Sequence, residues 1–116
     1  MRRREVETYR GLLEAQLASL VGQGERAVHE MVDAEAKDPD PNDRATAEEE
    51  RNWALRLRDR DRKLISKIRG ALERLQAGTF GTCSACGRPI SPARLRARPV
   101  TDLCLDCKVA AERAER

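Results

Sequence analysis

Aromatic residues are scarce in this sequence. Its 116 residues contain one Trp, one Tyr and one Phe, so aromatic residues make up 3% of the chain while charged residues make up 37%. A chain with so few large apolar side chains does not fill a broad globular core. We therefore expect a mostly α fold, in which long helices bury a narrow apolar strip. No apolar run approaches the ~18 residues of a membrane span.

The sequence also lacks the residue combinations from which most catalytic sites are built. It contains one histidine, His29, and no nucleophile with an evident neighbouring base, so we expect no enzymatic activity. The N-terminal arginines are not followed by an apolar segment, and we therefore expect no secretory signal. These absences favour a cytoplasmic protein.

Only four cysteines are present, and they form two pairs, Cys83 with Cys86 and Cys104 with Cys107. Thiolates at this spacing typically hold one tetrahedral Zn²⁺, and four sulfur ligands leave no position open for catalysis. The alternative is two disulfides, which need an oxidising compartment. We predict one structural zinc ion, which holds together a segment too small to bury a core of its own.

Apolar residues recur every three or four positions in two long segments, which predicts helices over 5–36 and 43–77. In the first helix, Gly22 and Gly24 weaken the middle, where we expect a bend or fraying. The first strip comprises Val6, Tyr9, Leu13, Leu17, Leu20, Val28, Met31 and Val32. The second comprises Ala54, Leu57, Asp61, Leu64, Ile68, Ala71 and Leu75, widened by Trp53, Ile65 and Leu72.

A short loop over 37–42 separates the two helices. It contains Pro39 and Pro41, and two prolines this close together do not lie inside a helix. Such a short connection folds the helices back antiparallel, so residues 1–77 are predicted to form a helical hairpin, or coiled coil. Residues 78–116 are predicted to form a zinc-finger module. In it, Ser91 and Pro92 begin a short helix, and a terminal helix follows Cys104.

Charge is unevenly distributed along the chain. The net charge is +3, but residues 33–50 carry a net −6 and the remainder a net +9. The acidic part is the tip of the hairpin. It is either a solvated turn with acids near a helix N-terminus, or a probe for a cationic surface or a metal ion. Phosphates would repel it, so we expect no sequence-specific DNA binding.

Three segments together resemble the DksA/TraR family of RNA polymerase-binding regulators. They are the tip from Asp40 to Ala45 with the acids at 48–50, the basic segment 58–65, and the finger from Phe80 to Lys108. The resemblance covers about residues 35–110. It implies a monomeric protein that inserts its coiled coil into the polymerase secondary channel. There the tip approaches the catalytic centre and alters open-complex stability, with the nucleotide ppGpp strengthening the effect.

The resemblance also implies roles for individual residues. Asp40, Asp43 and Ala45 match the tip residues that approach the polymerase active site. Helix capping by Asp40 and Asp43 is the alternative explanation for the two acids. The positions that match the ppGpp site are Lys67, Arg98 and Lys108. Basic side chains suit a ligand with two pyrophosphate groups, although exposed bases also serve solubility.

Two other classes of protein remain alternatives. GATA-type DNA-binding fingers share the spacing of the cysteine pairs, but they carry a Trp within the finger and a basic tail. Residues 83–107 contain no Trp, and residues 110–116 are mixed in charge. The second alternative is a structural coiled-coil adaptor that oligomerises through its apolar strip. Asp61 within that strip argues against a simple extended coiled coil.

Overall fold

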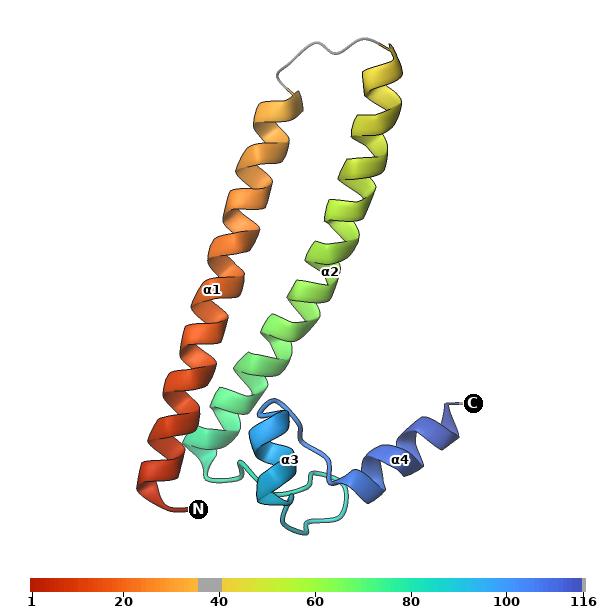
Figure 1. Ribbon diagram of the computed structural model, residues 1–116. Coiled ribbons are helices and arrows are strands. Elements are labelled where there is room, and N and C mark those ends of the chain that lie inside the picture. Colours follow the sequence, from red (N-terminus) through yellow and green to blue (C-terminus); the bar gives the residue numbers. More distant parts are fainter. Residues whose placement is uncertain (36–40, 116) are drawn as a thin grey trace. The chain divides into compact units, whose positions relative to one another are not determined.

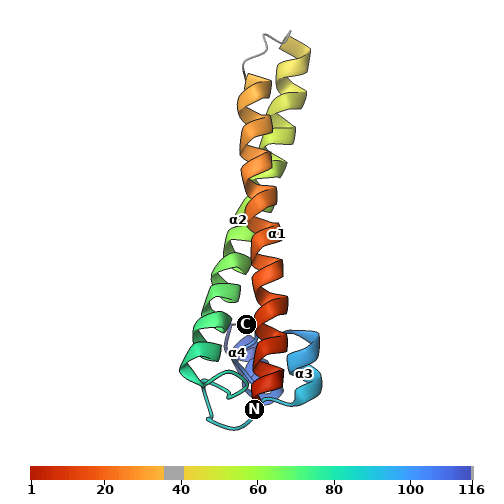
Figure 2. The same cartoon turned by 90° about the vertical axis from the view of Figure 1, so that its left-hand side faces the viewer.

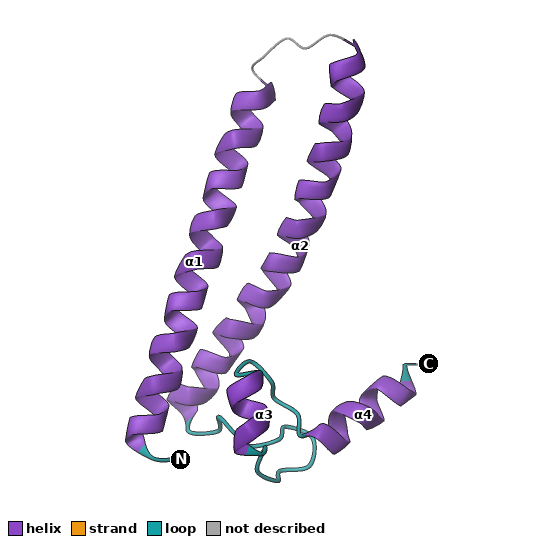
Figure 3. Cartoon of the chain, viewed as in Figure 1, coloured by secondary structure: helices purple, strands orange, loops and turns teal. Residues whose placement is uncertain are grey.

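The fold is mostly helical, as predicted. The computed structural model describes residues 1–35 and 41–115, and the side chains of these residues other than 31–35 and 41–45. Within these ranges, four helices follow one another along the chain (Figure 1). Figure 3 shows loops and turns, and no strand, in the rest of the described chain. The helices are α1 (Arg3–Glu35), α2 (Pro41–Ala77), α3 (Pro92–Ala97) and α4 (Leu105–Ala114).

The ends of the two long helices differ slightly from the prediction. α2 begins at Pro41, two residues before the predicted start. Proline fits the first turn of a helix because an N–H there has no acceptor within the helix. α1 continues through Gly22 and Gly24 without interruption, so the expected fraying does not occur. Most of the predicted loop 37–42 lies outside the described residues.

α1 and α2 pack antiparallel (Figures 1 and 2). The chain divides into two compact units that each contain part of both helices. The zinc-side unit consists of Met1–Ala15 and Lys67–Arg116, and the tip-side unit consists of Gln16–Ser66. The units therefore cut across the predicted division at residue 77. That division into hairpin and zinc-finger module stays a prediction.

The zinc-side unit contains the core. Leu13 of α1 and Ile68 and Ala71 of α2 are completely buried there. Tyr9 and Phe80 add an aromatic contact, with their ring centroids 5.0 Å apart. The other buried apolar residues of this unit are Leu75, Phe80, Cys83, Ile90 and Leu95. The end of the hairpin and the cysteine-bearing segment thus share one core, and truncating Leu13 or Ile68 to Ala would cost about 2–5 kcal/mol.

The tip-side unit has no buried side chain among those described. Trp53 and Leu57, both placed in the predicted apolar strip, are 59% and 41% exposed. Their burial was predicted wrongly for this part of the hairpin. The reason is geometric, because two helices without a third layer cover only a narrow face of each other. Here the apolar strip forms a helix contact that is half open to solvent.

α2 ends in a hydrogen-bonded cap centred on a glycine. Gly78 adopts a positive φ of 78°. Its N–H donates to the Leu75 carbonyl (3.4 Å), and the Thr79 N–H donates to the Arg74 carbonyl (2.9 Å). These two bonds form a Schellman motif, which satisfies carbonyls that the helix leaves without partners. The cap turns the chain out of α2 and into the zinc-binding segment.

Replacing two glycines by alanine is expected to change stability in opposite directions. A Cβ at Gly24 would meet no atom within 4 Å, so Gly24→Ala gains helix propensity at no steric cost. We expect it to stabilise the protein by about 0.5–1 kcal/mol. Gly78→Ala places a side chain at positive φ and is expected to destabilise it by about 1–2 kcal/mol. Thermal unfolding of the zinc-loaded variants measures both, and a loss of stability in Gly24→Ala would contradict this account.

Candidate functional site

The first cysteine pair lies in a tight turn. The Cys83 N–H donates to the Arg88 carbonyl (2.8 Å), and the Gly87 N–H donates back to the Cys83 carbonyl (2.9 Å). Gly87 has φ 75°, which a residue with a side chain rarely adopts. The turn is closed by a single antiparallel bridge between Thr82 and Pro89. It holds the sulfurs of Cys83 and Cys86 on one side.

The second pair lies at the start of α4. Cys104 is the residue preceding the helix, and the Lys108 N–H donates to its carbonyl (3.0 Å). One helical turn therefore brings Cys107 back beside Cys104. The two pairs are joined through Ser84 and Asp102. The Ser84 N–H donates to the Asp102 carbonyl (2.8 Å), and the Ser84 hydroxyl donates to Asp102 Oδ2 (3.3 Å).

All four cysteine sulfurs gather in one cluster, within 4.8 Å of one another. The sulfurs of Cys86 and Cys104 are 3.8 Å apart. Four thiolates around zinc, each at a Zn–S distance of ~2.3 Å, have sulfurs ~3.8 Å apart in a tetrahedron. The cluster therefore fits one tetrahedral zinc ion, and all four cysteines are free of disulfides. The ligand set predicted from the spacing is confirmed.

Two arginines that the sequence did not mark hold the loop before Cys104. Arg74 of α2 donates through Nη2 to the Val100 carbonyl (3.2 Å). Arg94 of α3 donates through Nε to the Leu103 carbonyl (3.0 Å) and through Nη2 to Thr101 Oγ1 (3.3 Å). α3 itself begins as predicted, since Ser91 Oγ accepts the Arg94 N–H (3.2 Å) and Pro92 follows. These bonds position the second cysteine pair against the hairpin.

Two of the four cysteine thiols, Cys83 and Cys107, have strongly shifted pKa values. Backbone N–H groups of Cys104, Cys86 and Ala85 face the Cys83 sulfur, and they lower its pKa from 9.0 to about 6. The Cys107 thiol donates to the sulfurs of Cys104 and Cys83. Because ionisation would remove these bonds and place a second charge beside them, the pKa of Cys107 rises to about 12. Of these two cysteines, Cys83 therefore ionises at the lower pH.

The other predicted site residues lie in different parts of the chain. Asp40 is outside the described residues, and Asp43 and Ala45 belong to the N-terminal turns of α2. Lys67 on α2 and Arg98, the residue after α3, are exposed. Lys108 on α4 lies 3.9 Å from the Glu112 carboxylate. Lys67, Arg98 and Lys108 all belong to the zinc-side unit, but no described hydrogen bond or ion pair links them.

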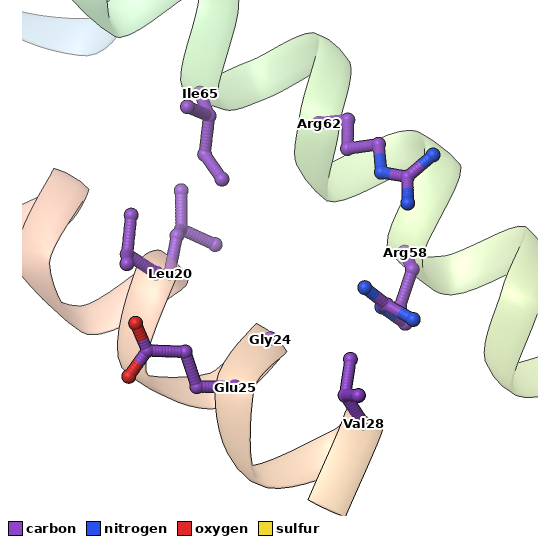
Figure 4. A pocket seen from close by; sticks show the side chains of 8 residues that line it. Leu20, Gly24, Glu25, Val28, Arg58, Arg62 and Ile65 are labelled. Carbon is purple, nitrogen blue, oxygen red and sulfur yellow. The ribbon is translucent and has the colours of Figure 1, made fainter. Parts of the chain in front are cut away.

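The tip-side unit contains a shallow groove of about 230 Å³ between α1 and α2. Figure 4 shows Leu20 and Ile65 pointing toward one another across it, with Arg58 opposite Val28. The absent side chain of Gly24 leaves this space open. The groove has a mainly apolar floor and charged edges. No helix of the described chain is long and apolar enough to cross a membrane.

Removal of zinc is expected to unfold the cysteine-bearing segment and leave much of the hairpin helical. The segment depends on the metal because, apart from the cysteines, it contributes only Phe80, Ile90 and Leu95 to the core. With a strong chelator, circular dichroism should retain most of the helical signal. Limited proteolysis should then cut within residues 78–116, and addition of zinc should restore resistance. Unchanged resistance after complete metal removal would contradict a structural role for zinc.

Zinc affinity is expected to fall steeply as the pH decreases. The high pKa of Cys107 means that zinc must displace at least its proton near neutral pH. Between pH 8 and 7 the dissociation constant should therefore rise about tenfold or more. Below the Cys83 pKa of about 6 a further proton must leave, and the dependence should steepen. Competition with a chromophoric chelator measures this, and a constant affinity from pH 8 to 7 would refute the proton assignment.

Comparison with known proteins identifies the family. The model of the DnaK suppressor protein DksA N-terminal domain matches residues 5–75, and that of the prokaryotic dksA/traR C4-type zinc finger matches residues 78–113. The RNA polymerase-binding transcription factor DksA of Escherichia coli (strain K12) is 45% identical over 116 residues, which cover 100% of this chain and 77% of that protein. The protein of the same name from Haemophilus influenzae is 44% identical, and 80% of its length is covered.

A solved structure agrees with the sequence relationships. Transcription factor DksA2 from Pseudomonas aeruginosa superposes with a TM-score of 0.88 at 38% identity, covering 98% of this chain and 88% of the other. The matched zinc-finger model is of the DksA/TraR type, which decides against the GATA-type alternative. The protein therefore belongs to the DksA/TraR family of non-enzymatic transcription factors, and its four cysteines bind one structural zinc ion.

Proposed function

We propose that this protein binds RNA polymerase and regulates transcription without recognising a promoter sequence. The observation that carries the proposal is similarity over the whole chain, at 44–45% identity, to proteins named RNA polymerase-binding transcription factors. The similarity includes both helices of the hairpin and the zinc finger, so it is not a match to a common metal-binding motif alone. We place the protein in the cytoplasm, as a monomer when free.

The hairpin is proposed to act from within the polymerase secondary channel. α2 has 37 residues, and at about 1.5 Å per residue it is on the order of 55 Å long, which suits entry into a deep channel. The tip residues Asp40, Asp43 and Ala45 would then approach the catalytic centre. Carboxylates there would compete for, or perturb, a site that contains magnesium, since Mg²⁺ prefers oxygen ligands. Altered open-complex stability follows from this arrangement.

The nucleotide ppGpp is proposed as a second ligand, bound by Lys67, Arg98 and Lys108 at the junction with polymerase. Exposure of Lys67 and Arg98 supports this, because their charges are accessible to a pyrophosphate group. The Lys108 side chain is 42% exposed, and its ammonium nitrogen lies 3.9 Å from the Glu112 carboxylate, whose side chain is 58% exposed. An exposed pair at this distance is weak, so a pyrophosphate could replace the Glu112 carboxylate at little cost.

Asp43→Asn is expected to abolish regulation while largely preserving polymerase binding. The substitution keeps the shape of the side chain and removes the charge that the proposal places near the catalytic centre. In transcription from a ribosomal RNA promoter by the cognate polymerase, wild type should inhibit, and more strongly with ppGpp. The variant should lose about fivefold or more of the inhibition, with less than about a twofold change in the dissociation constant for polymerase.

The matched control is Glu49→Gln, which removes a charge from the same acidic segment at an exposed position. It should inhibit like wild type. Equal loss of inhibition in both variants would show that inhibition depends on the total negative charge of the segment and not on Asp43 in particular. If wild type bound polymerase without any effect on transcription, the protein would be a competitor for the channel. Absence of polymerase binding would refute the proposed function.

A further inference from the structure

Trp53 is the only tryptophan of the chain, and it is not part of the core. Its side chain is 59% exposed on α2. The Arg56 guanidinium lies over its ring, with the guanidinium carbon 5.8 Å from the ring centroid. Arg56 in turn donates through Nε to the Asn52 carbonyl (3.4 Å), which holds the guanidinium near the indole. A large apolar side chain is thus kept in water in a defined position.

Trp53 belongs to a continuous exposed face of α2. Arg56, Leu57 and Arg60 follow it by three, four and seven residues, so these four residues lie on the same side of the helix. All four are exposed, and Leu57 is 41% exposed. We call this set the Trp53 face. Leu55, which is 43% exposed, lies two positions from Trp53 and therefore points to a different side of α2.

The composition of the Trp53 face is that of a binding hot spot. Trp and Arg are the residues that most often dominate the binding energy of protein interfaces. Burial of an exposed indole by a partner contributes strongly to the binding free energy, because it removes a large apolar area from water with little loss of side-chain conformational freedom. An exposed Trp contributes little to folding by comparison. Stability of the hairpin therefore gives no reason for a Trp at this position.

Charge indicates what kind of surface would cover the Trp53 face. Residues 51–63 contain six bases and two acids, so an acidic rim on the partner would be complementary. A nucleic acid would also meet these bases. However, residues 33–50 of the same hairpin carry a net −6 and would repel its phosphates. A protein surface matches both segments better, because its acidic rim can be confined to the part that faces residues 51–63, whereas phosphates continue along the whole nucleic acid.

We propose that Trp53 is an anchor that inserts into an apolar pocket with an acidic rim on RNA polymerase. This inference rests on the proposed function and adds a second contact to it. Ten residues of α2 separate Trp53 from Asp43, which corresponds to about 15 Å along the helix. Trp53 supplies affinity at that distance, whereas Asp43 supplies the effect on transcription. The two properties are therefore separable by mutation.

The first test compares Trp53→Ala with Leu55→Ala, which removes an exposed apolar side chain from another side of the same helix. Binding to the cognate polymerase is measured by competition, after circular dichroism and zinc content have established that each variant is folded. Trp53→Ala should weaken binding about tenfold or more, and Leu55→Ala less than about twofold. At saturating concentration, Trp53→Ala should still inhibit transcription, in contrast to Asp43→Asn.

The second test observes the indole itself. Protein labelled with 5-fluorotryptophan has a single ¹⁹F resonance, because Trp53 is the only tryptophan. Addition of unlabelled polymerase should shift and broaden this resonance, and addition of duplex DNA should leave it unchanged. Sedimentation of the labelled protein alone, at the same concentration, should give a monomer.

Each outcome separates the anchor from the proposed function. If wild type binds polymerase and Trp53→Ala binds equally well, the anchor is refuted and the proposed function stands. If wild type does not bind polymerase, the proposed function is refuted, and the anchor that rests on it is refuted too. A ¹⁹F shift with DNA alone would make the face a nucleic-acid surface and overturn the proposal. A shift that accompanies self-association without polymerase would make it a dimer contact, and would overturn it as well.

Discussion

The sulfur cluster is the constraint on which the zinc-side unit depends. It joins two cysteine pairs that are separated by seventeen residues in the sequence. Phe80, Ile90 and Leu95 of the same segment are buried, as are Leu13 and Ile68 of the two long helices. Metal binding therefore stabilises more than the finger, because the finger residues also cover the end of the hairpin. Lys108 follows the ligand Cys107 directly in the sequence, so its placement depends on the cluster too.

Burial is distributed unevenly along the hairpin, and stability and partner contact therefore belong to different parts of it. The zinc-side unit buries apolar residues from three parts of the chain, whereas the tip-side unit has only two helices with which to bury any. Stability therefore comes mainly from the zinc side. The tip side carries the residues proposed to meet a partner, and its apolar side chains remain accessible. A hairpin that must enter another protein benefits from such an arrangement, because the partner can supply the missing layer.

Charge divides the tip-side unit itself into two parts. An acidic segment at the tip precedes a basic segment on α2, and the change of sign occurs within a few residues. Two surfaces of opposite sign so close together select a partner with a matching pattern and disfavour a uniformly charged one, such as duplex DNA. In the zinc-side unit, Arg74 and Arg94 donate to backbone carbonyls. Those arginines serve structure, whereas Lys67 and Arg98 are exposed.

Local features were predictable from the sequence because their signals lie within a few neighbouring residues. Cysteine spacing determined the zinc ligands, apolar periodicity determined the two long helices, and Ser91 with Pro92 determined the start of α3. The family resemblance located the tip and the finger, although the roles of Asp43 and Lys67 stay predictions. Only the tertiary structure decided which positions of the apolar strip are buried, since Ile68 and Leu57 look alike in sequence but Ile68 is 0% exposed and Leu57 is 41% exposed. Only the tertiary structure shows that Arg74 and Arg94 hold the loop before Cys104. Every residue has a backbone carbonyl, so the sequence does not indicate which carbonyl an arginine side chain will reach.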